Sequence, residues 1–388
     1  MKASKTILIL LLIAVVLGAA LWLSMPRDLD LHLGGAEPAG PALTDCAVIH
    51  EPEFGGVYIK STIDDFNALG FACGDSVDVT FSNGFALQDL PYYNGFYTQS
   101  GEPLLIAYPG YDYIKAVVNS GDDLWEVAGL REGDTASITL NTAGKYLEIQ
   151  NARDIHYTDA REDYESDAVF ANFRAVKVTG IPEGRLYRSA SPCDNQHNRA
   201  PYVDGLMGEA GVKLILDLED DEAKIAGYLE DPGFASPNFR ALYEAGGVVP
   251  VALNMNYGSD AFREKLVDGL AAMSGKPGPY LVHCTEGKDR TGFVCMLLEA
   301  LCGASYQELV DDYMITYDNY YGITKASDPD RYDVIVESVF VPMLRSVVGD
   351  DTTDLETADL SEYATVFLQN AGMTDGQITA LRDRLTAA

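Results

Sequence analysis

The feature that most constrains this fold is a polar loop between an apolar strand pattern and an apolar helix pattern. Residues 280–283 form a short apolar run, residues 284–292 are mostly polar and contain two glycines, and residues 293–301 are almost wholly apolar. A buried strand that passes through a tight loop into a buried helix is typical of a sheet with parallel strands. The loop should therefore lie at the carboxyl edge of such a sheet, over the amino terminus of the helix.

The residues of this loop predict a site for a phosphate group. Five residues separate Cys284 from Arg290, so the loop can close into a cradle whose backbone N–H groups face an anion. That positive field favours the thiolate of Cys284, the form that acts as a nucleophile. Gly287 permits the backbone angles of a tight cradle, and the planar guanidinium of Arg290 matches two phosphate oxygens. Thr291 can donate its hydroxyl to the sulfur, and His283 can hold the loop through ring hydrogen bonds.

The segment His283–Gly292 resembles the signature loop of the protein tyrosine phosphatase superfamily, in the HCxxGKDRTG variant of bacterial secreted tyrosine and lipid phosphatases. Residues 172–174 (Asn-Phe-Arg) and 187–189 (Tyr-Arg-Ser) match further elements of that family. Residues 216–218 match its Asp-Leu-Arg strand, except that Glu219 replaces the arginine, which puts one supporting ion pair in doubt. The similarity extends over about residues 171–385, including the closing helices around Gly372–Asp375.

The resemblance implies an α/β domain over residues 166–388, with a mainly parallel sheet flanked by helices. The residue pattern agrees, since 212–218 and 248–253 are short apolar runs suited to buried strands, while 262–273 has helical spacing. Residues 360–385 read as two helices, the second capped by Thr374 or Asp375.

The resemblance also implies hydrolysis of a phosphate monoester through a phosphocysteine, with no metal and no cofactor. We expect a phosphotyrosine protein as substrate, and a phosphoinositide as the second choice, because Lys288 could contact extra phosphates. A catalytically silent phosphate-binding module is the alternative from another class, although Cys284, Arg290 and Thr291 are all present. The residues expected to contact the substrate are Thr285, Glu286, Gly287, Lys288, Gly292 and Arg188.

Two aspartates are candidates for the acid that protonates the leaving oxygen. Asp289 lies inside the loop beside Arg290, where related phosphatases carry an aspartate. Asp260 follows the 248–253 strand, where other relatives carry a mobile acid loop, but it also suits a cap of the helix that begins there. We favour Asp289, because proton donation requires hydrogen-bond reach of the substrate.

Residues 46–165 predict a small, mostly β domain, since Val77, Val79 and Phe81 alternate with polar residues and turn signals separate such runs. This region resembles the C-terminal β barrel of the SAM hydroxide adenosyltransferases, in Gly56-Val57, residues 63–67 and residues 129–134. The catalytic half of that family is absent, so no adenosyl transfer is expected. The tyrosine-rich stretch 92–113 is interpreted as barrel core and rim, with a ligand surface as the alternative.

The N-terminus predicts export. Lys2 and Lys5 precede an apolar run over residues 6–23, a pattern typical of a membrane anchor or a secretion signal. We favour an uncleaved anchor over residues 1–27, since no small-residue cleavage site follows, and a Gly/Ala/Pro-rich linker over residues 28–45. The protein is therefore expected to be extracytoplasmic, either bound to the membrane through this segment or secreted.

Charge and cysteine spacing exclude some classes of function. The formal net charge is −32, which opposes binding to nucleic acid. The six cysteines form no CxxC pair and no Cys/His cluster with metal-ligand spacing, so no metal site is expected.

Overall fold

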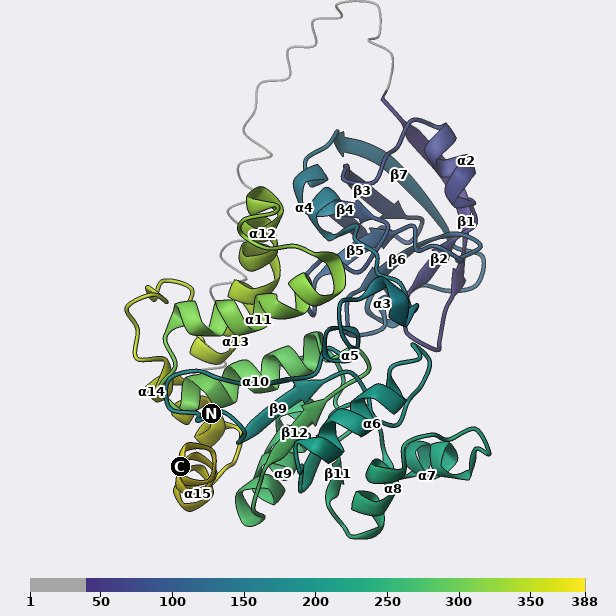
Figure 1. Cartoon of the computed structure of the whole chain (residues 1–388). Helices are drawn as coiled ribbons and strands as arrows, with labels where there is room; N and C mark the ends of the chain where they lie inside the picture. Colours follow the sequence, from purple (N-terminus) through teal and green to yellow (C-terminus); the bar gives the residue numbers. More distant parts are fainter. Residues whose placement is uncertain (1–39, 388) are drawn as a thin grey trace, which may run out of the picture. The chain divides into compact units, whose positions relative to one another are not determined.

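The computed structural model describes residues 40–387 (Figure 1). The predicted anchor or signal, residues 1–27, lies outside the described residues, as does most of the predicted linker. No helix in the described part of the chain is long and apolar enough to cross a membrane.

The first part of the described chain is a closed β barrel. Val79 of β3 pairs with Ile138 of β7, and both side chains are fully buried, as the alternating pattern predicts. The predicted barrel is thus confirmed. Around it the strands follow the order β1-β2-β6-β5-β4-β3-β7. Their bounds are β1 (Ala42–His50), β2 (Val57–Ile59), β3 (Ser76–Phe81), β4 (Ala86–Tyr93), β5 (Pro103–Ile106), β6 (Ile114–Val118) and β7 (Thr135–Thr142), with short helices α2 (Ile63–Ala68) and α3 (Leu124–Val127) in the connections.

The start of the barrel corrects one sequence expectation. Strand β1 begins at Ala42, inside the segment 28–45 that was expected to be a linker. Leu43 pairs with Ile138 of β7, and this ladder, rather than the Pro/Gly composition before it, decides where ordered structure begins.

A connecting segment with α4 (Leu147–Arg153), η1 (Arg161–Asp163) and α5 (Asp167–Phe170) leads into a five-stranded sheet of order β11-β10-β12-β9-β8. Its strands are β8 (Arg174–Ala175), β9 (Leu186–Ser189), β10 (Leu214–Asp217), β11 (Val248–Pro250) and β12 (Tyr280–His283). The last four are parallel to one another, whereas β8 runs antiparallel to β9. The carboxyl ends of β9, β10 and β12 meet at one edge, because Ser189 and Asp217 both pair in register with His283.

Helices cover both faces of this sheet (Figure 1). Alternate residues of a strand point to opposite faces, so Ile215 joins the core formed with α6 and α8, while Leu214 and Leu216 join the core on the other side. The helices of the first side are α6 (Ala200–Glu209), α7 (Glu222–Glu230) and α8 (Pro237–Glu244). Those of the second side are α9 (Asp260–Gly275), α10 (Asp289–Leu301), α11 (Tyr306–Tyr321), α12 (Pro329–Ile335), η2 (Val336–Phe340), α13 (Val341–Val348), α14 (Leu360–Asn370) and α15 (Asp375–Thr386).

Helix α10 is the centre of the second core. Every residue from Thr291 to Leu301 is buried, as expected of a helix that is apolar all round. Its amino terminus is thereby fixed at the end of β12, where the polar loop lies. The two closing helices are also confirmed, since Thr374 caps α15 and forms a capping box with Gln377.

Candidate functional site

The loop between β12 and α10 closes tightly against the neighbouring strand β9. Gly287 has a φ of +72°, and a Cβ atom there would lie 2.3 Å from the carbonyl oxygen of Ser189. A non-glycine residue would be strained by the backbone angle and would collide with β9. Glycine is therefore required for the loop to turn where it does.

Cys284 lies at the end of β12 and is 3% exposed. The first turn of α10 follows within the loop, so backbone N–H groups without helical partners lie at this position. Thr291 is fully buried, and its hydroxyl has no hydrogen-bond partner among the described residues. This unpaired donor, seven residues beyond Cys284 at the base of the loop, can serve a sulfur or phosphate ligand.

Arg290 is held by two groups outside the loop. Its Nη1 donates to the carbonyl of Leu253 at 3.2 Å, and its Nη2 forms an ion pair with Glu219. Its Nε is buried and has no partner among the described residues. Burial disfavours the charged guanidinium, but the nearby Cys284 and Glu219 outweigh it and keep the pKa of Arg290 above its ordinary value. The free Nε can therefore bind an anion while Glu219 orients the plane.

Glu219 takes part in the site, which the sequence reasoning missed. Besides Arg290, it accepts a 2.7 Å hydrogen bond from the Thr285 hydroxyl. Burial raises the pKa of Glu219, but the charge of Arg290 and the hydrogen bond from Thr285 lower it by more. The pKa of Glu219 is therefore below its ordinary value. The substitution that put a supporting ion pair in doubt thus supplies a different one, to Arg290 itself.

The loop's other charged residues pair with one another. Lys288 Nζ lies 2.9 Å from a Glu286 carboxylate oxygen and 3.9 Å from one of Asp289. Tyr157 donates its hydroxyl to Glu286 at 2.6 Å. Burial lowers the pKa of Lys288, but Asp289 and Glu286 raise it above its ordinary value. Glu286 therefore points into this network, and the charge of Lys288 is already balanced within the loop.

Arg188 was expected to contact substrate, and the structure places it elsewhere. Its side chain is 1% exposed, donates to the carbonyl of Gly287 at 3.0 Å, and pairs with Asp312 at 2.6 Å. Two of its guanidinium nitrogens bind Asp312 and the loop backbone, and its Nε is buried with no partner among the described residues. Arg188 therefore holds the loop in place from inside the protein. Arg174 also binds Asp312, and these two arginines outweigh burial to lower the pKa of Asp312 to about 2.

Asn172 holds the loop from the side. It is buried at a positive φ of 48°, a conformation that asparagine tolerates better than most residues. Its side-chain amide donates to the carbonyl of Glu286 at 3.2 Å, and Tyr320 donates its hydroxyl to the same carbonyl at 2.7 Å. The Asn-Phe-Arg element noted in the sequence therefore supports the loop.

His283, Asp217 and Cys193 form a buried cluster behind the loop. Their ligand atoms lie within 4.8 Å of one another, so they are the group in the described chain that could hold a metal ion. Burial lowers the pKa of His283 to about 4 and raises that of Asp217 to about 7. His283 has no hydrogen-bond partner on either ring nitrogen among the described residues, and its Nε2 lies 3.7 Å from Asp217. The sequence analysis did not predict that these three residues meet, because Cys193, Asp217 and His283 are far apart in the sequence.

The two candidate acids lie in very different places. Asp260 is the first residue of α9, its side chain is 94% exposed, and it pairs with Arg263 at 3.7 Å, while Ser259 caps the helix. Asp289 is the first residue of α10, is 38% exposed, and lines a cavity beside the loop. Of the two, Asp289 is therefore the one that lies beside the loop.

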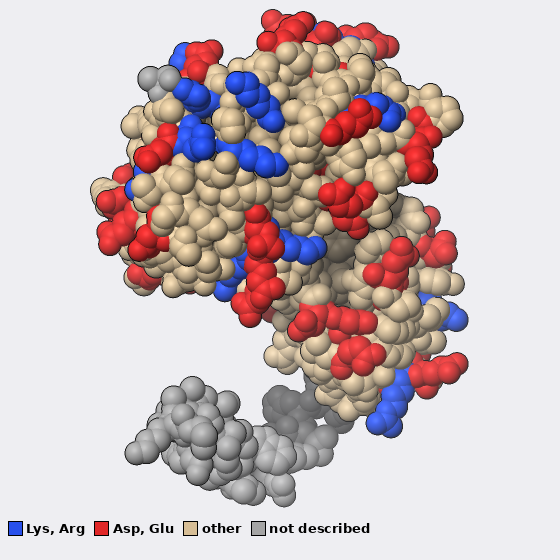
Figure 2. Space-filling model, turned by 90° about the horizontal axis from the view of Figure 1, so that it is seen from below, with Lys and Arg blue, Asp and Glu red and all other residues tan. Residues whose placement is uncertain are grey.

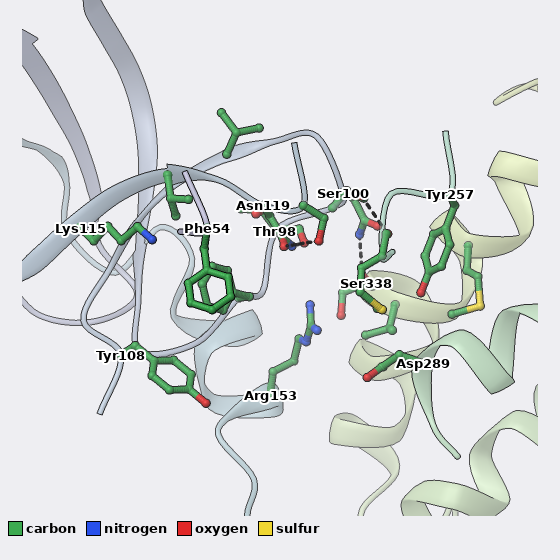
Figure 3. A pocket seen from close by; sticks show the side chains of 18 of the residues that line it. Phe54, Thr98, Ser100, Tyr108, Lys115, Asn119, Arg153, Tyr257, Asp289 and Ser338 are labelled. Atoms are coloured by element: carbon green, nitrogen blue, oxygen red, sulfur yellow. Dashed lines mark hydrogen bonds between the residues drawn. The ribbon is translucent and has the colours of Figure 1, made fainter. Parts of the chain in front are cut away.

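This cavity has a volume of about 590 Å³ and walls from both halves of the chain (Figure 3). Tyr257 and Asp289 lie on one side, Phe54 and Tyr108 on the other, and Arg153 points in between them.

Comparison with known proteins finds one family. Residues 146–387 match the sequence pattern of the tyrosine phosphatase family. No curated protein matches the chain. Among solved structures, an uncharacterized conserved protein from Thermotoga maritima aligns at 20% identity and a TM-score of 0.23, over 30% of this chain and 46% of its own.

Proposed function

Because this chain belongs to the tyrosine phosphatase family, we propose that it hydrolyses phosphate monoesters through a phosphocysteine on Cys284. The observation that carries the proposal is the closed loop at the end of β12. It brings together a cysteine at the end of β12, the amino terminus of α10 and an arginine whose Nε has no partner among the described residues. Such a site can hold a phosphate and stabilise the charge of its transition state.

In the first step the Cys284 thiolate attacks phosphorus, and the bond between phosphorus and the leaving oxygen breaks. Asp289 gives its proton to that oxygen, so the product leaves as a neutral alcohol or phenol. Arg290 binds two equatorial oxygens, since its planar fork matches them and Glu219 holds its orientation.

In the second step water attacks the phosphocysteine, and the Asp289 carboxylate accepts the water's proton. The bond between sulfur and phosphorus breaks, and inorganic phosphate leaves. The Thr291 hydroxyl, which is buried without a partner, donates to the departing sulfur and stabilises its negative charge.

We propose phosphotyrosine in protein as the substrate class. A phosphoinositide headgroup carries several phosphates and would require several unpaired cations. Lys288, the loop residue best placed for a second phosphate, is paired with Glu286. The net charge of −32 further opposes a polyanion, and acidic side chains are spread over the face seen in Figure 2.

The alternative is a silent module that only binds phosphate, and turnover of an aryl phosphate separates the two. The parent protein should release phosphate from 4-nitrophenyl phosphate, whereas Cys284→Ser should bind phosphate without turnover, because a serine hydroxyl is not ionised at neutral pH. Arg290→Lys should lose about 10²–10³-fold in kcat, since a point charge replaces the fork. Near-parent turnover by Cys284→Ser would contradict the mechanism.

A further inference from the structure

The cavity beside the loop is built only partly by the phosphatase domain. The family pattern begins at residue 146, so the barrel residues that line the cavity lie outside it. The barrel side supplies aromatic rings and amides, and the other side supplies Met255, Tyr257, Asp289, Ser338 and Met343. The barrel residues are chiefly Phe54, Phe96, Tyr108, Tyr111, Gln99 and Asn119.

The barrel wall is attached to the phosphatase domain at this cavity. Gln99 donates its side-chain amide to the carbonyl of Ser338 at 2.7 Å, and Ser100 donates its hydroxyl to the carbonyl of Met255 at 3.1 Å (Figure 3). These bonds join a barrel loop to the two segments that flank the cavity. The cavity is therefore a fixed feature of the fold, and its volume lies in the range of ligand sites.

The cavity also reaches the proposed reaction centre. Asp289 is one of its lining residues, and Tyr257 lines it next to the loop. The Tyr257 ring stacks on Phe293, in the first turns of α10, with 4.7 Å between the ring centroids. A phosphate ester bound at Cys284 would thus have its leaving group on the side of this cavity.

One unbalanced positive charge lies among these mostly apolar walls. Lys115 lines the cavity too, but it is bonded to Glu51 at 2.5 Å. Arg153 donates one nitrogen to the carbonyl of Tyr97 at 2.7 Å and stacks its guanidinium on the Tyr97 ring, 5.0 Å from its centroid. No acidic side chain pairs with Arg153 in the described chain, and it points into the cavity (Figure 3). A ligand with apolar groups and one carboxylate complements these walls.

We propose that the β barrel, together with Arg153 of α4, forms half of the substrate site and binds the residues that flank phosphotyrosine in a peptide. An apolar side chain packs against Phe54 and Tyr108, and a neighbouring carboxylate pairs with Arg153. The inference rests on the proposed phosphatase function and extends it to substrate choice. A polyphosphorylated lipid headgroup fits less well, because the cavity offers one unpaired cation.

The test compares three phosphotyrosine peptides, which carry Glu, Gln or Lys beside the phosphotyrosine and are otherwise identical, each with a Leu after that position. The small reference substrate is 4-nitrophenyl phosphate. The parent should prefer the Glu peptide through a lower KM. Arg153→Met should reduce that preference about tenfold, since a lost ion pair of this kind is worth about one decade in affinity. Arg153→Glu should reverse it in favour of a Lys peptide, a gain that a misfolded variant cannot produce.

Phe54 tests the apolar wall without disturbing the fold, because it is 74% exposed. Phe54→Ala should lower kcat/KM for the Leu-containing peptides about threefold to tenfold more than for 4-nitrophenyl phosphate. Val127→Ala and Arg131→Met, exposed barrel substitutions outside the cavity, are the controls and should leave every ratio within twofold.

The outcomes distinguish this inference from the proposed function. If the parent does not hydrolyse 4-nitrophenyl phosphate, the proposed function itself fails. If it does, but the peptide ratios are the same in Arg153→Met, Phe54→Ala and the controls, the barrel and Arg153 do not bind the substrate. Faster turnover of a soluble short-chain phosphoinositide than of every peptide would also overturn the inference.

Discussion

Replacing Gly287 by alanine tests whether the position of the loop backbone, rather than its residue types alone, supports turnover. Gly287 has a φ of +72°, and its added Cβ would lie 2.3 Å from the Ser189 carbonyl oxygen. Gly349, at the end of α13, has the same φ of +72°, but nothing lies within 4 Å of its added Cβ. Gly349→Ala is therefore a control with the same backbone strain and no collision.

The expected magnitudes follow from these two environments. Both substitutions should cost about 1–2 kcal/mol of stability from the left-handed backbone angle. Ordinary van der Waals contact begins at 3.4 Å, so in Gly287→Ala the loop must move by about 1 Å away from β9. A misplacement of that size at a reacting centre costs about 10²-fold in rate. Gly349→Ala should keep the parent kcat/KM.

The assay measures kcat/KM for 4-nitrophenyl phosphate together with the midpoint of urea unfolding for both variants. The reasoning predicts that the two variants are destabilised alike or that Gly287→Ala is the less stable, and that only Gly287→Ala loses turnover. If folded Gly287→Ala turns over within threefold of Gly349→Ala, contact with β9 does not position the loop, and the argument from geometry is refuted.

Three further predictions concern the acid, the buried cluster and the N-terminus. Asp289→Asn should slow the hydrolysis of an aryl phosphate with a poor leaving group about 10²-fold or more, and that of one with a good leaving group much less. Asp260→Asn should slow neither reaction. The reverse pattern would assign the acid to Asp260. In the folded protein, burial raises the pKa of Asp217 to about 7. The unfolded chain loses this proton from about pH 4, whereas the folded protein keeps it up to about pH 7. The contribution of Asp217 to the free energy of unfolding therefore falls as the pH rises from about 4 to 7. Asp217→Asn should therefore gain stability relative to the parent between pH 5 and pH 8 in urea titrations, and a constant difference would show that Asp217 is ionised throughout. A reporter fused after residue 30 should be exported, and recovery of the fusion in the cytoplasm would reject both the anchor and the signal.

Much of the site could be predicted because the loop is local in sequence. Strand β12, the five residues after it and the first turn of α10 place Cys284, Gly287, Arg290 and Thr291 within one short segment of the chain. Periodicity likewise predicted the barrel, since inward and outward residues alternate along a strand whatever its neighbours are.

Other parts of the site depend on contacts between distant residues. Arg188 carries the same charge in the sequence as Arg290, yet β9 buries it beneath the loop, where Asp312 of α11 neutralises it. Glu219 was noted only as a departure from a pattern, because its partner Arg290 lies on another strand's loop. Asp260 and Asp289 each begin a helix, and only their surroundings separate an exposed carboxylate from one that lines a cavity.

The sequence alone thus predicted the candidate nucleophile, the arginine and the loop that joins them, because short-range geometry and chemical type suffice for a cradle. The tertiary structure decided which charges are free and which are paired, since pairing depends on residues that meet only when the sheet and helices pack. It also decided that the barrel borders the site. The hydrogen bond between Gln99 and Ser338 joins residues 239 positions apart, and no local sequence pattern can predict a contact over that separation.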